Sequence, residues 1–118
     1  MTDGVTQVKC MDFAVRIVKL CRHLCDEKRE YVLSKQLLRS GTGVGANFRE
    51  AKYAQSSGDF ISKSSIALKE IAETEYWLEL LYRTDYLTEK EYDSIRRDCS
   101  EIARLLTSIV KTSKQNSC

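Results

Sequence analysis

Two observations predict an all-α fold, an antiparallel up-down-up-down four-helix bundle. Apolar side chains recur at alternating steps of four and three through most of the 118 residues, which is the spacing of helices that pack at a shallow angle. Proline is absent and only five glycines occur, so few residues interrupt a helix. The length suits a single domain over residues 1–118, with a core of its own.

The first helix is expected over residues 6–25 and carries two adjacent apolar stripes. One stripe is formed by Cys10, Phe13, Ile17, Leu20 and Leu24, and the other by Val8, Met11, Val15 and Val18. Together they make a broad apolar face typical of a bundle helix. The face is wider than a single bundle core requires, which predicts that the chain associates with copies of itself.

The second helix is expected over residues 29–56, although Gly41, Gly43 and Gly45 lie inside it. A 4-3-4-3 register continues through the glycines, in Leu37, Gly41, Val44, Phe48 and Ala51. This favours one continuous helix over a kink or a short loop, at a cost of about 2–3 kcal/mol relative to alanines. We interpret the glycines as positions of close helix approach, because a dinucleotide-binding glycine motif requires a preceding strand.

The third and fourth helices are expected over residues 59–84 and 88–113. In the third, the buried stripe is formed by Phe60, Ser64, Ala67, Ile71, Thr74, Leu78 and Leu81. Before it, the Ser56–Asp59 segment offers a turn with capping side chains. Thr88 and Glu91 have the spacing of a capping box at the start of the fourth helix. The polar residues 114–118 are expected to form a frayed tail.

The composition predicts a cytoplasmic protein that does not contact a membrane. No apolar run is long enough to span a bilayer, and the N-terminus lacks the pattern of a secretory signal. The cysteines are odd in number and fit a reducing compartment: Cys10, Cys21, Cys25, Cys99 and Cys118.

No catalytic residue, cofactor or metal site is predicted, so we expect a protein that is not an enzyme. A di-metal bundle requires two Glu-x-x-His pairs, but the chain has one histidine, His23, and no such pair. Cys21 and Cys25 are one helical turn apart and lack further ligands nearby, so they do not make a zinc site.

The charge is unevenly distributed along the chain. Residues 1–58 carry ten basic and six acidic residues, a net charge of +4. Residues 59–118 carry nine basic and eleven acidic residues, a net charge of −2. This difference is common on solvated surfaces, but it also suits an anionic partner or self-association between unlike faces. The best candidates for contacting an anion recur along the first helix with few neutralising acids, namely Lys9, Arg16, Lys19 and Arg22.

Three segments carry a family resemblance, namely residues 36–40 (QLLRS), 47–51 (NFREA) and 69–81 (KEIAETEYWLELL). With them, the chain resembles, over roughly residues 10–112, the bacterial four-helix-bundle proteins encoded within intervening sequences of 23S rRNA genes. It is also similar to a related branch, the accessory variability proteins of diversity-generating retroelements. The resemblance implies a cytoplasmic ring of five bundles with a role in binding RNA, and it brings no catalytic residues.

Five residues match signature positions of that family, namely Asn47, Glu50, Glu70, Glu73 and Trp77. We interpret them as structural residues that hold the second and third helices together. Partly buried carboxylates need partners, so the glutamates are expected to pair with Arg39, Arg49 or Lys69, or with the amide of Asn47.

The sequence therefore favours a homo-oligomeric bundle, most simply a pentamer, that binds RNA or an RNA-associated protein through its basic surface. The alternative is a protein-interaction scaffold that does not contact nucleic acid. Any RNA binding is expected to be weakly sequence-selective, because the chain shows no helix-turn-helix spacing, zinc knuckle or aromatic ribonucleoprotein motif.

Overall fold

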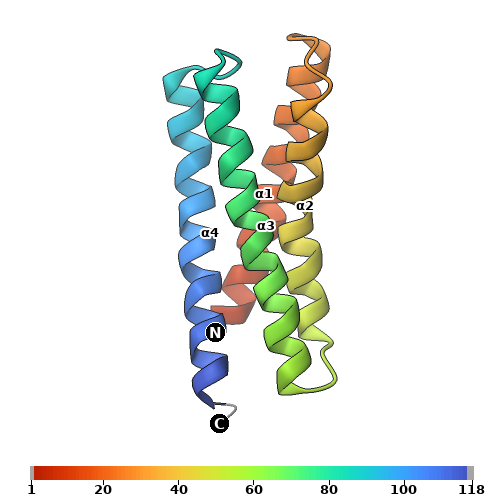
Figure 1. Cartoon of the computed structure of the whole chain (residues 1–118), viewed down its shortest axis with the longest axis vertical. Helices are drawn as coiled ribbons and strands as arrows, with labels where there is room; N and C mark the ends of the chain where they lie inside the picture. The colour runs from red at the N-terminus through yellow and green to blue at the C-terminus, as the bar shows by residue number, and fades with distance from the viewer. Residues whose placement is uncertain (1, 117–118) are drawn as a thin grey trace.

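The computed structural model describes residues 2–116, with side-chain environments from Gly4 onward, as four antiparallel helices (Figure 1). They are α1 (Thr2–Asp26), α2 (Leu33–Lys52), α3 (Ser57–Arg83) and α4 (Glu89–Asn116). Each helix packs against the next and α4 closes the bundle against α1, while the Cα atoms of the diagonal pairs, α1 with α3 and α2 with α4, do not come within 8 Å of each other. The predicted up-down-up-down bundle is confirmed, with extents of 49 × 21 × 20 Å.

The second helix begins at Leu33 rather than at residue 29, so that boundary was predicted wrongly. Arg29 has a φ of 53°, a left-handed conformation that a helix does not continue through. The carboxylate of Glu30 instead accepts hydrogen bonds from the N–H groups of Val32, Leu33 and Ser34, at 3.2, 3.0 and 2.7 Å. Glu30 thus satisfies free amides at the start of α2, two to four residues after it in the chain. A search for Ser, Thr, Asp or Asn caps does not find this arrangement.

The inner helix ends other than the start of α2 differ from the predictions by one to four residues. Helix α2 stops at Lys52 rather than 56, because the Tyr53 and Ala54 amides bond to carbonyls only three residues back. Ser56 caps α3 by accepting from the Asp59 amide at 3.1 Å. The capping box of α4 is confirmed: the Thr88 amide donates to Glu91 at 2.8 Å, and the Glu91 amide donates to the Thr88 hydroxyl at 3.1 Å.

The two outer ends were predicted too short. Helix α1 already begins at Thr2 rather than at residue 6, and α4 continues to Asn116 rather than to residue 113. Most of the expected frayed tail is therefore helical, while Ser117 and Cys118 lie outside the described residues. Among the described helices, none combines the length and the apolar character that crossing a membrane requires.

The core consists of one stripe from each helix, and the stripes predicted for α2 and α3 are buried, with Phe60 half-buried. Of the two stripes predicted for α1, the first is buried at Cys10, Phe13, Ile17 and Leu24, with Leu20 packed at its edge. The second α1 stripe does not join the core, because Val8, Met11 and Val15 are exposed. The broad apolar face predicted for this helix is thus divided between the core and the outer surface.

The glycine segment of α2 is a continuous helix, as predicted. A Cβ on Gly41 would lie 2.8 Å from the side chain of Ile17, and a Cβ on Gly45 would lie 3.3 Å from Cys10. On the opposite side, a Cβ on Gly43 would lie 3.1 Å from the Glu70 carboxylate. Two glycines therefore let α1 approach α2 closely and the third makes room for an α3 side chain, which confirms the close-approach interpretation.

Candidate functional site

A network of charged and polar side chains joins α2 to α3. Arg39 donates a hydrogen bond to the Glu73 carboxylate, and its other terminal nitrogen lies 3.7 Å from Glu70. Glu73 also accepts a hydrogen bond of 2.9 Å from the indole N–H of Trp77. Two of the five signature residues, Glu70 and Glu73, therefore share one guanidinium, and a third, Trp77, binds Glu73. Arg39 is the one predicted partner that is correct.

The remaining predicted pairings are wrong. Glu50 forms its ion pair with Lys63 at 3.0 Å, and the Asn47 amide donates to the carbonyl of Gly43 at 2.8 Å. Arg49 and Lys69 are exposed and make no ion pair with any described residue. Asn47 bonds within its own helix because the carbonyl of Gly43, one turn back, is within reach of its side-chain amide.

Below this network, hydroxyl groups cross the same α2–α3 boundary inside the core. The Thr74 hydroxyl lies 2.9 Å from that of Ser40, and both side chains are fully buried. One carboxylate oxygen of Glu70 is also buried and has no hydrogen bond, so the nearby Arg39 charge is its main compensation. These contacts hold α2 and α3 in register. Among the described residues, no cluster of three or more His, Cys, Asp or Glu side chains could hold a metal ion.

Three of the cysteines, Cys10, Cys21 and Cys99, are buried and are poor nucleophiles. Burial raises the pKa of the Cys10 thiol to about 11 and that of Cys99 to about 12. Cys21 has a pKa of about 12, because of its burial and the nearby Cys25 and Glu30. A thiol attacks as the thiolate, so these three side chains are unreactive at neutral pH.

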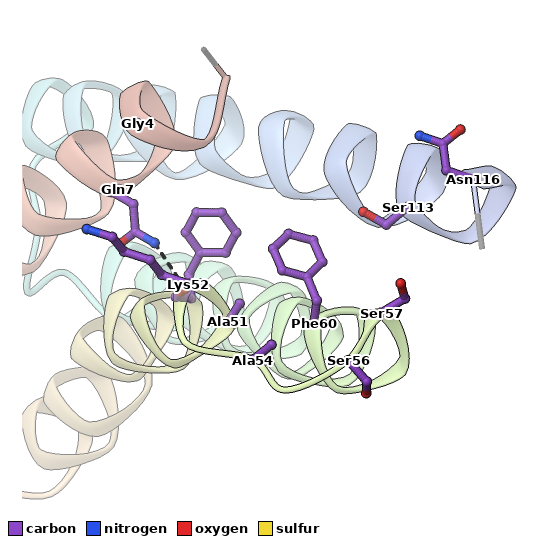
Figure 2. Close-up of a pocket in the computed structure, with 11 residues that line it drawn as sticks. Gly4, Gln7, Ala51, Lys52, Ala54, Ser56, Ser57, Phe60, Ser113 and Asn116 are labelled. Atoms are coloured by element: carbon purple, nitrogen blue, oxygen red, sulfur yellow. Dashed lines mark hydrogen bonds between the residues drawn. The ribbon is translucent and has the colours of Figure 1, made fainter.

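A recess of about 720 Å³ lies at the end of the bundle, where α1 stops short of the α2–α3 turn and of the end of α4 (Figures 1 and 2). Phe60 points into it. Gln7, another lining residue, donates a hydrogen bond of 3.1 Å from its side-chain amide to the Phe48 carbonyl. Lys52 is the one ionisable side chain among the described lining residues. The recess therefore has no acid–base pair with which to perform catalysis.

The basic side chains predicted on α1 divide into two pairs with different surroundings. Lys9 lies 3.2 Å from Glu101 and Arg16 lies 2.7 Å from Asp98, both on α4. The expectation that few acids neutralise this helix is wrong for these two, because α4 runs beside α1 and supplies the acids. Lys19 and Arg22 are exposed and make no ion pair with any described residue.

The outer edge of α4 carries a more regular basic row. Lys90, Arg97, Arg104 and Lys111 recur every seventh residue and are all exposed, which sets neighbouring charges roughly 10 Å apart along the helix. Arg97 lies 3.3 Å from Asp93, whereas the other three make no ion pair with a described residue. Helix α4 also contributes none of the described large apolar side chains that are exposed.

Comparison with known proteins places the chain in a family. The family profile described as 23S rRNA-intervening sequence protein matches residues 5–108. The chain belongs to this family. It is 58% identical to a protein of unknown function from the S23 ribosomal protein family of Bacteroides thetaiotaomicron. The match to the crystal structure of that protein covers 94% of this chain and 99% of the other, with a TM-score of 0.93. No curated protein matches.

In this family member, the signature residues and the basic residues occupy different parts of the bundle. Glu70, Glu73 and Trp77 line the α2–α3 boundary, while the basic row lies on α4, diagonally across the bundle from α2. The net charge of each half of the chain does not reveal the row, because the acids of α4 offset its cations. A search for Lys or Arg at seven-residue intervals would have found it.

Proposed function

We propose that this family member is a non-enzymatic, self-associating helical bundle of the cytoplasm that binds RNA through its basic surface. The observation that carries the proposal is the row of Lys90, Arg97, Arg104 and Lys111 along the outer edge of α4. An exposed row of cations without apolar neighbours suits a phosphate backbone better than it suits a protein partner, whose interface core is apolar and poor in charge.

Self-association strengthens the proposal. The family resemblance implies a ring of five copies, in which the row would recur five times around one axis. Symmetric repetition of a basic row produces a stronger field than one subunit does, and it raises the affinity for a long polyanion by multivalent contact.

RNA binding through such a row is expected to be electrostatic and weakly sequence-selective. Lys and Arg side chains on a helix edge contact phosphates and release counterions, so the logarithm of the association constant falls linearly with the logarithm of salt concentration. Each phosphate contact that is lost reduces the slope by about 0.7 for single-stranded RNA.

Two charge-reversal variants test the site by fluorescence anisotropy with a labelled RNA across a salt series. Arg104→Glu with Lys111→Glu alters the α4 row, and Lys19→Glu with Arg22→Glu alters the free cations of α1 by the same net charge. We expect the α4 variant to weaken RNA binding at least 10-fold and to reduce the slope of its salt dependence by about 1.4. The α1 variant should change both quantities less. Unchanged binding by the α4 variant would contradict the assignment to α4.

The protein-scaffold alternative has a separate outcome in the same experiment. If the wild-type oligomer is not retained on RNA even at low salt, the basic row does not serve RNA binding. An acidic protein partner would then be the better explanation of the exposed cations.

A further inference from the structure

We propose that the groove between the C-terminal half of α1 and the start of α4 binds one unpaired nucleotide of the RNA. The base would lie against an apolar floor and the phosphate between cations of the two helices. This inference rests on the function proposed above for the source of the nucleotide, and it adds a contact to a base where the α4 row contacts phosphates. The ligand class is a nucleoside monophosphate, which can be tested without RNA.

The groove opens because α1 is inclined to α4. Near its N-terminus, α1 lies beside α4, where Lys9 and Glu101 form an ion pair. Its C-terminal end lies on the α2 side of the bundle, away from the start of α4 (Figure 1). The groove between them has a volume of about 490 Å³. Sites for small molecules occupy roughly 300–1,000 Å³, so one nucleotide is a ligand of suitable size.

Three aliphatic side chains form the floor of the groove. Leu20 comes from α1, Leu87 from the loop before α4, and Ile95 from the second turn of α4. Leu87 and Ile95 belong to the core and Leu20 packs against it, so the bundle itself holds the floor in place. A flat ring that covers this floor removes apolar surface from water, whichever base it is.

His23 adds an aromatic ring to the groove. It lies one helical turn after Lys19 on α1, and it is an exposed lining residue. Histidine is among the side chains on which proteins stack unpaired RNA bases. A base in the groove can therefore contact both the aliphatic floor and an aromatic side chain.

Cations from both helices flank the floor. Lys19 of α1 and Lys90 of α4 line the groove, are exposed and make no ion pair with any described residue. Both are therefore available to a phosphate group. Arg16 contributes less, because its guanidinium already binds Asp98 and the Ser94 hydroxyl, at 2.7 and 3.1 Å.

The charge balance of the groove favours an anionic ligand. Glu91 is the one acid among the described lining residues, and it already accepts a hydrogen bond of 2.8 Å from the Thr88 amide. Two free cations thus face one engaged carboxylate. Inorganic phosphate would leave the floor uncovered, and a purely apolar ligand would leave the cations unused. A nucleotide satisfies both parts of the groove.

The groove continues the proposed RNA surface. Lys90 lines it and is also the first cation of the α4 row. A strand whose phosphates follow the row toward the start of α4 therefore reaches the groove, where one base can turn inward. A base in a duplex is held by its pair and its stack. We therefore expect RNA with unpaired nucleotides to bind more tightly than a duplex of the same length.

Proton NMR of the full-length, untagged protein tests the site without RNA. His23 is the one histidine of the sequence, so its ring protons report on this groove alone. We expect adenosine monophosphate to shift these signals saturably at millimolar concentration. Ribose phosphate, which carries the phosphate but no base, should shift them far less. Equal shifts with the two ligands, or none with adenosine monophosphate, would overturn the nucleotide site and leave the α4 row unaffected.

Two charge-matched variants locate the site. Lys19→Gln with Lys90→Gln removes the free cations of the groove and keeps the His23 signal, while Arg104→Gln with Lys111→Gln removes the same charge from the far part of the row. We expect the groove variant to weaken adenosine monophosphate binding about 5-fold and the row variant less than about 2-fold. Equal weakening would indicate a general effect of charge and would overturn the assignment to the groove. Circular dichroism should show wild-type helicity in both variants, because all four side chains are exposed.

A single-stranded RNA whose adenines are replaced by aminopurine, a fluorescent base analogue, tests the source of the nucleotide. We expect acrylamide to quench its fluorescence less in the complex than in the free strand, because the groove shields a base. Anisotropy measures RNA binding in parallel. Bound RNA that is quenched as strongly as the free strand would overturn base insertion but not the α4 row. A protein that binds adenosine monophosphate but not RNA would overturn the RNA function and leave a free mononucleotide as the ligand of the groove.

Discussion

The boundary between α2 and α3 and the boundary between α1 and α4 are both crossed by ion pairs, but the carboxylates of these pairs lie at different depths. At the α2–α3 boundary, the Glu70 and Glu73 side chains are 21% and 35% exposed and share the guanidinium of Arg39, which is itself 53% exposed. At the α1–α4 boundary, Arg16 and Asp98 are 41% and 43% exposed. Only the first set connects to buried hydroxyls and to a tryptophan.

The difference indicates which contacts specify the fold and which only adjust the surface charge. Ion pairs in solvent contribute about 0–1 kcal/mol each, because water screens them and the side chains lose conformational freedom. Removing one partner of a more buried pair has a larger effect, because the other charge is then left without compensation. We therefore expect substitutions at the α2–α3 boundary to destabilise the protein, and equivalent ones at the α1–α4 boundary to have little effect.

The largest effect is expected from Trp77→Ala. The indole packs against the core and its N–H binds Glu73, so its removal leaves a cavity and takes away one of the two hydrogen bonds that the Glu73 carboxylate accepts from Arg39 and Trp77. Because the side chain is half-buried, the free energy of unfolding should fall by about 3 kcal/mol, the low end for an aromatic truncation. Urea denaturation at one fixed protein concentration measures it.

Tyr53→Ala is the matched control for Trp77→Ala. Tyr53 follows the end of α2 and is highly exposed, so its truncation should change stability by less than about 0.5 kcal/mol. Equal losses in both variants would show that Trp77 contributes no more than a surface aromatic does.

The second comparison is between Arg39→Ala and Arg16→Ala, which remove one arginine from each boundary. Arg39→Ala leaves two carboxylates without their shared cation and should lower the free energy of unfolding by about 1–2 kcal/mol. Arg16→Ala exposes Asp98 to water and should cost less than about 1 kcal/mol. The difference between the two losses of stability should narrow in the double variants with Glu73→Ala and Asp98→Ala. The first removes one of the two carboxylates that Arg39→Ala leaves behind, and the second removes the carboxylate left by Arg16→Ala. A larger loss in Arg16→Ala would reverse the ranking of the two boundaries.

The fold could be predicted from the sequence because it depends on spacing. The 4-3 stripes identify which side chains of α2 and α3 are buried, and the register through Gly41 and Gly45 shows that the helix continues. The start of α2 could not be predicted in this way. Glu30 acts from a loop residue through three backbone amides, and no helical period marks that arrangement.

The ion pairs were harder to predict because they depend on neighbouring helices. The nearest acid to Arg16 along its own helix is Asp12, but its ion pair is with Asp98, which only the packing of α4 beside α1 brings to it. The α1 stripes present the same difficulty, since a sequence does not show that Val8 and Val15 face outward while Phe13 and Ile17 face inward. The spacing of apolar residues identifies the apolar face of a helix, but the number of neighbouring helices decides how much of that face is buried.

The smallest expected effect concerns the carboxylates that cap α2 and α4, one buried and one exposed. Burial by itself would raise the pKa of Glu30, but hydrogen bonds from the Leu33, Ser34 and Val32 amides outweigh it and hold the pKa below 4.5. Glu91 has a lowered pKa chiefly because the Thr88 amide donates to it. In both cases, the stabilisation is present above the ordinary pKa and is lost as the pH falls through the lowered value.

Glu30→Gln should therefore lower the free energy of unfolding at pH 7 by about 1 kcal/mol, the typical value of a helix cap. Glu91→Gln should lower it by less, because Glu91 is exposed and accepts from one amide rather than three. The difference between wild type and Glu30→Gln should shrink as the pH is lowered below 4.5, since protonated Glu30 resembles glutamine. Thermal unfolding from pH 7 to pH 3 measures this convergence. A Glu30→Gln deficit that stays constant down to pH 3 would show that the buried carboxylate stabilises α2 by its shape rather than by its charge.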